Sequence, residues 1–146
     1  MKLTRFGAVI LMAYSLILVG CTPTTASATK TIPTVEPGKA VVVGRIVSEQ
    51  DDKPYADIVV RLAEVYYNDK NEGAYALDAA YSPGATTDKD GYFVFTNITA
   101  RKYVFVVGDP LTSYMIYTDT DGKAKVWDAA PDKVLDMGTL KIKFNP

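Results

Sequence analysis

From residue 40 onward, apolar side chains recur at every second position, which is the repeat of a β-strand and not that of an α-helix. In the clearest example, Leu140, Ile142 and Phe144 alternate with two lysines. The same alternation marks segments 42–47, 58–62, 92–95 and 103–107, and two shorter candidates are 114–118 and 123–127. These seven short strands, separated by turn residues, predict an all-β fold in which two sheets pack as a sandwich.

Short polar segments between these strands predict how they are connected. The first two strands are expected to be joined by the polar turn 49–54, and segments 92–95 and 103–107 are expected to form a hairpin. Phe93 and Phe95 share one face of their strand, because side chains in a strand alternate between its two faces. We predict that both rings lie in the core.

The first twenty residues have the three parts of a secretory signal. Two basic residues are followed by the apolar run 6–19 and then by Gly20, a small residue. The run is shorter than the about 20 apolar residues that a membrane-spanning helix needs. We therefore predict that residues 1–20 are a signal peptide; the alternative is a simple N-terminal membrane helix.

The signal ends in Leu18-Val19-Gly20-Cys21, which resembles the bacterial lipobox. The resemblance implies that the thiol of Cys21 is diacylated and that the chain is cut before this residue. Two or three acyl chains give lasting membrane attachment, whereas one chain holds a protein only weakly. We predict a lipid anchor at Cys21 that holds the protein outside the cytoplasm, on the cell membrane or the outer membrane.

Residues 21–39 are rich in Thr, Ala and Pro and contain almost no large apolar side chains. Such a segment cannot bury enough apolar surface to fold. It is therefore predicted to be a lipidated, disordered tether, and residues 40–146 are predicted to be the one folded domain that it carries.

The composition excludes several classes of function. Cys21 is the only cysteine and the chain has no histidine, which excludes disulfides, cysteine-based metal clusters and imidazole catalysis. Without its signal, the chain has 14 basic and 17 acidic residues, a net charge of −3 that gives no electrostatic reason to bind nucleic acid. No glycine-rich phosphate loop follows a strand, so no nucleotide cofactor is predicted. We expect a protein that is not an enzyme and that uses no cofactor.

Two Asp-x-Asp-Gly segments, 88–91 and 119–122, contain the oxygen ligands that calcium prefers. Neither segment has the ligand spacing of an EF-hand loop, and Asp-Gly is also typical of hairpin turns. We predict structural turns and no metal site. Trp127 has two interpretations, a core residue or a platform on which a sugar stacks.

Two stretches resemble the carboxypeptidase regulatory-like domains. The first comprises Val42-x-Gly44-x-Ile46 and segment 54–62, and the second comprises segment 87–95 followed by Tyr103-x-Phe105-x-Val107. The resemblance covers residues 40–108 and implies a seven-stranded transthyretin-like sandwich, related in layout to the immunoglobulin-like sandwiches. It also implies an accessory role without catalytic residues. Arg101 departs from the family, which usually has Gly two residues before the core Tyr, so the turn there is expected to differ.

Residues 66–84 separate two predicted strands by more than the two to five residues of a typical hairpin loop. This segment contains four tyrosines, Tyr66, Tyr67, Tyr75 and Tyr81, whose rings can stack on sugars or pack on a protein. We hypothesise that they form the recognition surface. In the first alternative, residues 72–81 form a helical turn or two. In the second, Tyr75, Leu77 and Ala79 form an extra strand with a period of two, and the tyrosines merely cover the core.

The leading functional hypothesis is a non-catalytic, membrane-anchored lipoprotein that presents a β-sandwich for protein binding, or as an accessory of an envelope assembly. Its expected partners are the membrane, through the lipid, and an unknown envelope protein. The alternative is a carbohydrate-binding surface lipoprotein whose Tyr and Trp side chains contact a glycan. A third class is an enzyme that uses only carboxylates.

Overall fold

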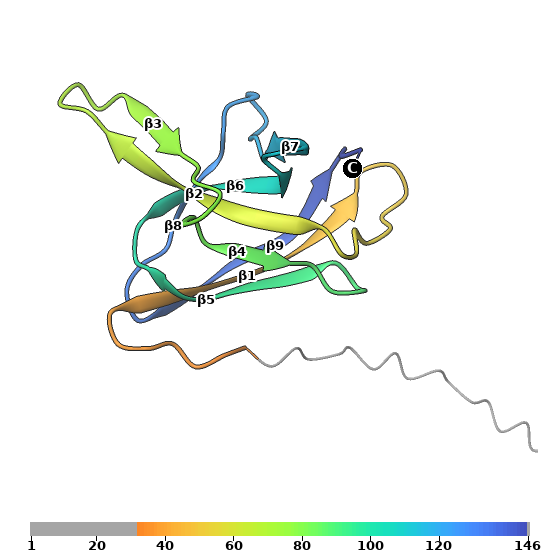
Figure 1. Cartoon of the computed structure of the whole chain (residues 1–146), viewed down its shortest axis with the longest axis horizontal. Helices are drawn as coiled ribbons and strands as arrows, with labels where there is room; N and C mark the ends of the chain where they lie inside the picture. Colours follow the sequence, from red (N-terminus) through yellow and green to blue (C-terminus); the bar gives the residue numbers. More distant parts are fainter. Residues whose placement is uncertain (1–31, 146) are drawn as a thin grey trace, which may run out of the picture. The chain divides into compact units, whose positions relative to one another are not determined.

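The computed structural model describes residues 32–145 (Figure 1). The predicted signal peptide, the lipid site at Cys21 and the tether as far as residue 31 lie outside the described residues. This part of the chain contains no helix, and hence none that could cross a membrane. The helical interpretation of residues 72–81 is therefore wrong.

The described chain forms nine strands: β1 (Lys39–Ser48), β2 (Val59–Tyr67), β3 (Gly73–Ala76), β4 (Gly84–Thr86), β5 (Tyr92–Thr99), β6 (Lys102–Asp109), β7 (Ser113–Ile116), β8 (Val126–Asp128) and β9 (Lys133–Ile142). Sheet A has the order β5-β1-β9. Sheet B has the order β3-β2-β6-β7, with β4 also paired to β2 and β8 also paired to β6. The predicted all-β sandwich is confirmed, with nine strands instead of seven. β3 contains Tyr75 of the alternative extra strand but ends at Ala76, and β4 is too short to show an alternating pattern.

Strand β1 lies at the centre of sheet A, antiparallel to β5 and parallel to β9. β9 begins at Lys133, well before the alternating segment that predicted it. Its pairing with β1 shifts at a bulge next to Gly138, which has a φ of +70° and donates its N–H to the Asp136 carboxylate (2.8 Å). The bulge changes the spacing of the buried residues, so that Met137 and Leu140 face inward three positions apart.

The predicted hairpin of β5 and β6 is wrong. β5 pairs with β1 in sheet A, whereas β6 pairs with β2 in sheet B, so residues 100–101 carry the chain from one sheet to the other. Arg101 lies in this turn, and its φ is not positive, which explains why the position does not need glycine. Alternation in the sequence predicts which side chains face inward but does not predict which strands pair.

The core lies between the inner faces of the two sheets. The predicted core residues Phe93 and Phe95 are buried, as confirmed by exposed fractions of 1% and 2%. Phe93 stacks on Phe105 of the opposite sheet, with ring centroids 4.7 Å apart. Gly44 makes room for this stack, because a Cβ at this position would lie 2.5 Å from the Cζ atom of Phe93.

Sheet B also carries a second, smaller apolar cluster on its outer face. Ala63, Val104 and Val106 are buried there, and Leu77 and Ala124 are among the partly buried residues that cover them. These two covering residues come from segments 77–83 and 117–125, which interrupt the two edges of the sheet between β3 and β4 and between β7 and β8. The middle of sheet B is therefore apolar on both faces.

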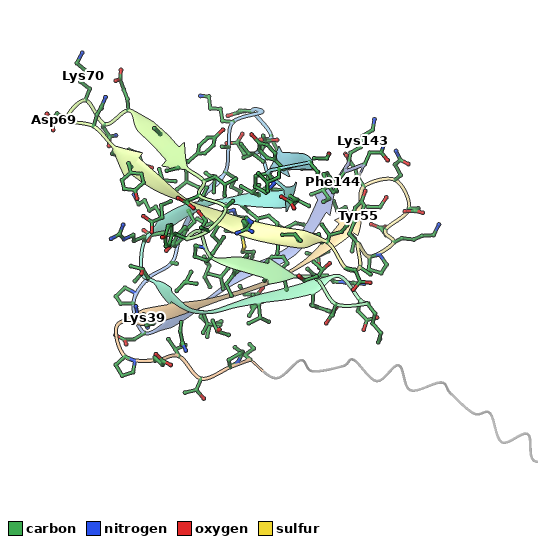
Figure 2. The ribbon with its side chains drawn as sticks, in the orientation of Figure 1. Lys39, Tyr55, Asp69, Lys70, Lys143 and Phe144 are labelled. Carbon is green, nitrogen blue, oxygen red and sulfur yellow. The ribbon has the colours of Figure 1, made fainter. Side chains whose placement is uncertain are left out.

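The base of the predicted tether contacts the domain. Gly38 donates its N–H to the Asp132 carboxylate (2.7 Å), and Asn97 donates from its side-chain amide to the Glu36 carboxylate (2.6 Å). At the other end of sheet A, the Tyr55 hydroxyl donates to the carbonyl of Phe144 (2.8 Å). Figure 2 shows Lys39 at one end of the domain and Tyr55 and Phe144 at the opposite end.

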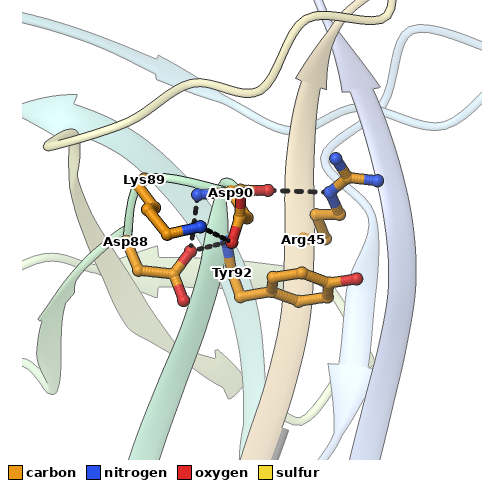
Figure 3. A network of polar contacts seen from close by, with 5 residues as sticks. All are labelled: Arg45, Asp88, Lys89, Asp90 and Tyr92. Carbon is orange, nitrogen blue, oxygen red and sulfur yellow. Dashed lines mark hydrogen bonds and ion pairs between the residues drawn. The ribbon is translucent and has the colours of Figure 1, made fainter. Parts of the chain in front are cut away.

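Both Asp-x-Asp-Gly segments form turns that their first aspartate stabilises. Asp88 accepts hydrogen bonds at Oδ1 from the N–H groups of Asp90 (3.0 Å) and Tyr92 (2.9 Å), as Figure 3 shows. The Asp119 carboxylate accepts in the same way from Asp121 and Lys123 (both 3.0 Å). In each segment this carboxylate is thus engaged by the backbone of its own turn.

Candidate functional site

The four tyrosines of the hypothesised recognition surface are exposed to different degrees. The exposed fractions are 52% for Tyr66, 45% for Tyr67, 47% for Tyr75 and 88% for Tyr81. The segment that contains them is not a single loop. It comprises the hairpin of β2 and β3, a turn at residues 78–82, and β4.

Tyr67 and Tyr75 lie on the outer face of sheet B. The inner face of β2 is marked by Val60 and Leu62, which belong to the main core, so the odd-numbered residues of this strand face outward. Cross-strand pairing places Tyr75 opposite Val65 and thus on the same outer face as Tyr67. The structure therefore brings two of the four tyrosines together.

Tyr66 faces the other way, toward the inner side of sheet B. Its hydroxyl donates to the Glu64 carboxylate (2.5 Å), which also forms an ion pair with Arg101 (2.7 Å). The hydrogen bond to this carboxylate raises the pKa of the Tyr66 hydroxyl above its usual value. Tyr66 therefore belongs to a polar cluster at the edge of the core and not to the surface that Tyr67 and Tyr75 share.

Tyr81 projects from a turn that its neighbours hold. The Asp78 carboxylate accepts from the N–H groups of Ala80 (2.7 Å) and Tyr81 (3.1 Å), while the N–H of Asp78 donates to the Ser82 hydroxyl (2.9 Å). The Tyr81 ring consequently points into solvent, apart from the Tyr67 and Tyr75 pair.

A shallow depression with a volume of about 220 Å³ lies beside Tyr67 and Tyr75, and we call it the outer groove. It is lined by Val65, Tyr67, Gly73, Ala74, Tyr75, Val104, Ala124 and Val126. The Tyr67 ring lies over Gly73, where a Cβ would come within 3.1 Å of its Cε1 atom. The Lys102 amino group lies 5.2 Å from the centroid of the same ring, in a cation–π contact.

The lining of the outer groove is mostly apolar. Apart from the two tyrosine hydroxyls, the side chains that line it are apolar. Nowhere in residues 32–145 do three or more carboxylates gather as a metal ion would require. The groove can hold an apolar group against Val65 and Val104, with aromatic rings on one side and Val126 on the other.

Sequence reasoning missed Val104, Ala124 and Val126 as parts of this surface. Val104 and Val126 meet there through the pairing of β6 with β8, which nothing in the local sequence predicts, and Ala124 lies in the segment that leads into β8. Trp127 faces the opposite side, packed against the main core, with the Lys125 amino group 4.1 Å from its ring centroid. Its neighbour Val126, with an exposed fraction of 43%, is the residue of β8 that faces the groove.

Neither a family model nor a curated protein matches this chain. Among solved structures, it is similar to the group B streptococcus pilus 2b backbone protein, with 16% identity, a TM-score of 0.40 and coverage of 70% of this chain and 40% of that chain. It is also similar to a DUF3823 family protein from Bacteroides uniformis, with 19% identity, a TM-score of 0.43 and coverage of 70% of this chain and 42% of that chain. It is similar as well to the major pilin subunit of Bacillus cereus, with 9% identity, a TM-score of 0.43 and coverage of 72% of this chain and 30% of that chain.

The chain spans less than half the length of each of these three proteins. The likeness is one of small β-sandwich domains, and it assigns no family. Identities this low transfer no function to the chain.

Proposed function

We propose that the chain is a non-catalytic lipoprotein that is anchored through Cys21 to the cell membrane or the outer membrane and binds a protein outside the cytoplasm. In this role it serves as an accessory of an envelope assembly. The observation that carries the proposal is the outer groove, an apolar depression bordered by the half-exposed rings of Tyr67 and Tyr75.

The lining of the outer groove favours a protein partner over a glycan. Protein interfaces concentrate their binding energy where aromatic and aliphatic side chains form a small apolar pocket. A sugar site needs several converging polar groups, whereas the side chains that line this groove offer only two hydroxyls. The pair of neighbouring tyrosine rings supports a second candidate function, carbohydrate binding.

We also propose that the domain is of the carboxypeptidase regulatory-like, transthyretin-like kind. Residues 87–95 support this proposal, because the turn that Asp88 stabilises leads into β5, whose Phe93 and Phe95 fill the core. This arrangement agrees with what the resemblance implies for the motif. An accessory role without catalysis follows from the same resemblance.

Photo-crosslinking in intact cells tests the choice of surface. A photoreactive phenylalanine derivative replaces Tyr75 or Tyr67 in the groove variants, and Tyr66 or Lys89 in the controls. Tyr66 is a matched control, since it is adjacent in sequence and similarly exposed but faces the other side of β2. We expect a discrete protein adduct from positions 75 and 67 and none from positions 66 and 89.

Equal crosslinking from all four positions, or from none, contradicts the proposal. If no protein is captured but the purified chain binds a glycan array, and Tyr75→Ser abolishes this binding, the carbohydrate function replaces it. The variants remain folded in either case, because exposed tyrosines contribute about 1 kcal/mol or less to the free energy of unfolding. Thermal melting of Tyr67→Ser and Tyr75→Ser checks this point.

A further inference from the structure

A pocket separate from the outer groove lies at the end of sheet A opposite the base of the tether, and we call it the end pocket. Its volume of about 400 Å³ falls within the range of about 300–1,000 Å³ that is typical of small-molecule sites. Figure 2 shows three of its residues, Tyr55, Lys143 and Phe144, at this end of the domain, with Lys39 at the other end. The complete lining is Ser48, Gln50, Tyr55, Lys143, Phe144 and Asn145.

The parallel pairing of β1 and β9 brings the two walls of the end pocket together. Because these strands run in the same direction, the segments that follow them leave sheet A at the same end. The N–H of Glu49, after β1, donates to the carbonyl of Ile142 at the end of β9 (2.8 Å). The Tyr55 hydroxyl donates to the carbonyl of Phe144 (2.8 Å) and accepts from its N–H (3.2 Å). Backbone hydrogen bonds therefore hold both walls in place.

Three of the lining residues have exposed polar side chains. They are Gln50, Lys143 and Asn145. No hydrogen bond or ion pair joins these side chains to another residue in the described part of the chain. The Ser48 hydroxyl differs, because it accepts from the N–H of Gln50 (3.2 Å) and belongs to the turn. Two amide groups and one ammonium group are thus accessible to a ligand.

The end pocket has an excess of positive charge. Lys143 forms no ion pair within residues 32–145, and no carboxylate lines the pocket. Two acids of the adjacent turn, Asp51 and Asp52, are already paired with lysines (both 2.6 Å). Charge complementarity therefore favours an acidic ligand over a basic one.

The lining favours a saccharide over a protein side chain. Amide groups both donate and accept hydrogen bonds, as the hydroxyl groups of a sugar do. The partly buried Tyr55 ring, which meets Phe144 edge to face at 6.4 Å, offers an aromatic surface to a sugar ring. No Val, Leu or Ile lines the pocket, whereas the central pockets of protein interfaces combine aromatic with aliphatic side chains.

We infer that the end pocket binds an acidic saccharide. Lys143 pairs with the carboxylate of the sugar, Gln50 and Asn145 bind its hydroxyl groups, and Tyr55 packs against its ring. This inference goes beyond the proposed function, because the end pocket shares no residue with the outer groove.

The test uses the full chain, purified in detergent, and saturation-transfer difference NMR, which detects weak ligands of a large particle. The probes are trimers of galacturonic acid and of mannuronic acid, each with its methyl ester, and an acidic tripeptide with one central aspartate. Each ester is a matched control, since it keeps the rings and hydroxyl groups of the acid but has no charge. Titrations give the Kd of each probe for the parent and the variants, and thermal melting verifies that each variant is folded.

The variants are chosen to separate the charge from the hydrogen bonds. Lys143→Gln removes the proposed ion pair, and Lys143→Arg retains a cation. Gln50→Ala and Asn145→Ala each remove one amide. Lys133→Gln is the charge control, because it removes one positive charge at the other end of β9.

We expect at least one acid to bind, and its ester to bind about three- to fivefold more weakly, as an exposed ion pair allows. Lys143→Gln should remove this difference, whereas Lys143→Arg and Lys133→Gln should retain it. Gln50→Ala and Asn145→Ala should weaken acid and ester alike. The inference is overturned if neither acid binds, if acid and ester bind the parent equally, or if the tripeptide binds as tightly as the acids.

A further variant, Tyr75→Ser, separates this inference from the proposed function. It lies in the outer groove, so it should leave saccharide binding at the end pocket unchanged. If Tyr75→Ser abolishes binding and Lys143→Gln does not, the saccharide binds in the outer groove and the inference is wrong. If the acids bind as expected but crosslinking from the outer groove captures no protein, the inference stands and the proposed function fails.

Discussion

Thr87 joins two segments of the sandwich through one buried hydroxyl. The residue is 2% exposed, and its Oγ1 donates to the carbonyl of Tyr55 (2.7 Å) and accepts from the N–H of Ile58 (2.9 Å). Backbone hydrogen bonds also join Thr87 to Ile58 and Asp57. Replacing Thr87 with Val keeps the shape of the side chain but removes the hydroxyl, which deprives the Ile58 amide and the Tyr55 carbonyl of this partner.

A buried polar group left without a partner costs about 1–3 kcal/mol. Thr87→Val leaves two such groups, but it also removes a hydroxyl whose burial costs free energy. The expected net loss in the free energy of unfolding is therefore about 2–4 kcal/mol. At roughly 4 °C per kcal/mol for a domain of this size, Tm falls by about 8–16 °C. Thr87→Ser keeps the hydroxyl and loses one methyl group, so it should cost about 1 kcal/mol.

Calorimetry and urea titration, followed by the fluorescence of Trp127, measure both variants. Trp127 is the only tryptophan of the chain and packs on the core, so its emission reports global unfolding. The expected order of stability is parent, then Thr87→Ser, then Thr87→Val. The reasoning is refuted if Thr87→Val melts within about 3 °C of the parent, or if Thr87→Ser is the less stable of the two.

Further predictions concern the core, the response to pH and the anchor. Phe93→Ala and Phe95→Ala should each lower the free energy of unfolding by about 3–5 kcal/mol in urea titrations. Unchanged melting of both variants would show that the two rings do not fill the core. Burial and, secondarily, the Glu64 carboxylate raise the pKa of Tyr103 to about 12 from its ordinary 10. The folded state therefore favours the protonated hydroxyl, so its contribution to stability is complete below pH 10 and is lost as the pH rises from 10 to 12. Urea titrations at both ends of this window measure this loss of unfolding free energy, which should be smaller for Tyr103→Phe than for the parent. Cys21→Ser should abolish labelling by a palmitate analogue and stop cleavage of the signal, and equal labelling of the variant would exclude Cys21 as the lipid site.

The alternation of apolar residues predicted which side chains face the core because this pattern depends only on the local geometry of a strand. It succeeded for Phe93, Phe95 and Leu140, which are all buried. It missed the first part of β9, because the bulge near Gly138 breaks the period of two. The hairpin was predicted wrongly for another reason: a two-residue connection can either return a strand within one sheet or cross to the other, and the choice depends on distant partners.

The candidate site also has a part that local sequence predicts and a part that depends on which strands pair. The tyrosine-rich segment was recognised from its composition, and the opposite facing of Tyr66 and Tyr67 follows from the period of two once β2 is known to extend that far. The other half of the surface could not be predicted. Val104 and Val126 reach it only through the register of β6 with β2 and β8, which non-local packing determines.

The parallel arrangement of β1 and β9 determines how the domain responds to mechanical force. The chain enters sheet A at the start of β1, where Asp132 binds Gly38, and β9 ends at the opposite end, where Tyr55 binds Phe144. Tension between these two ends acts along the strands, so the hydrogen bonds that join them are loaded together in shear. An antiparallel pair pulled at adjacent ends opens one bond at a time. Because forced unfolding is governed by the unfolding rate, a domain held at its N-terminus would resist a steady pull far longer than its equilibrium stability alone indicates.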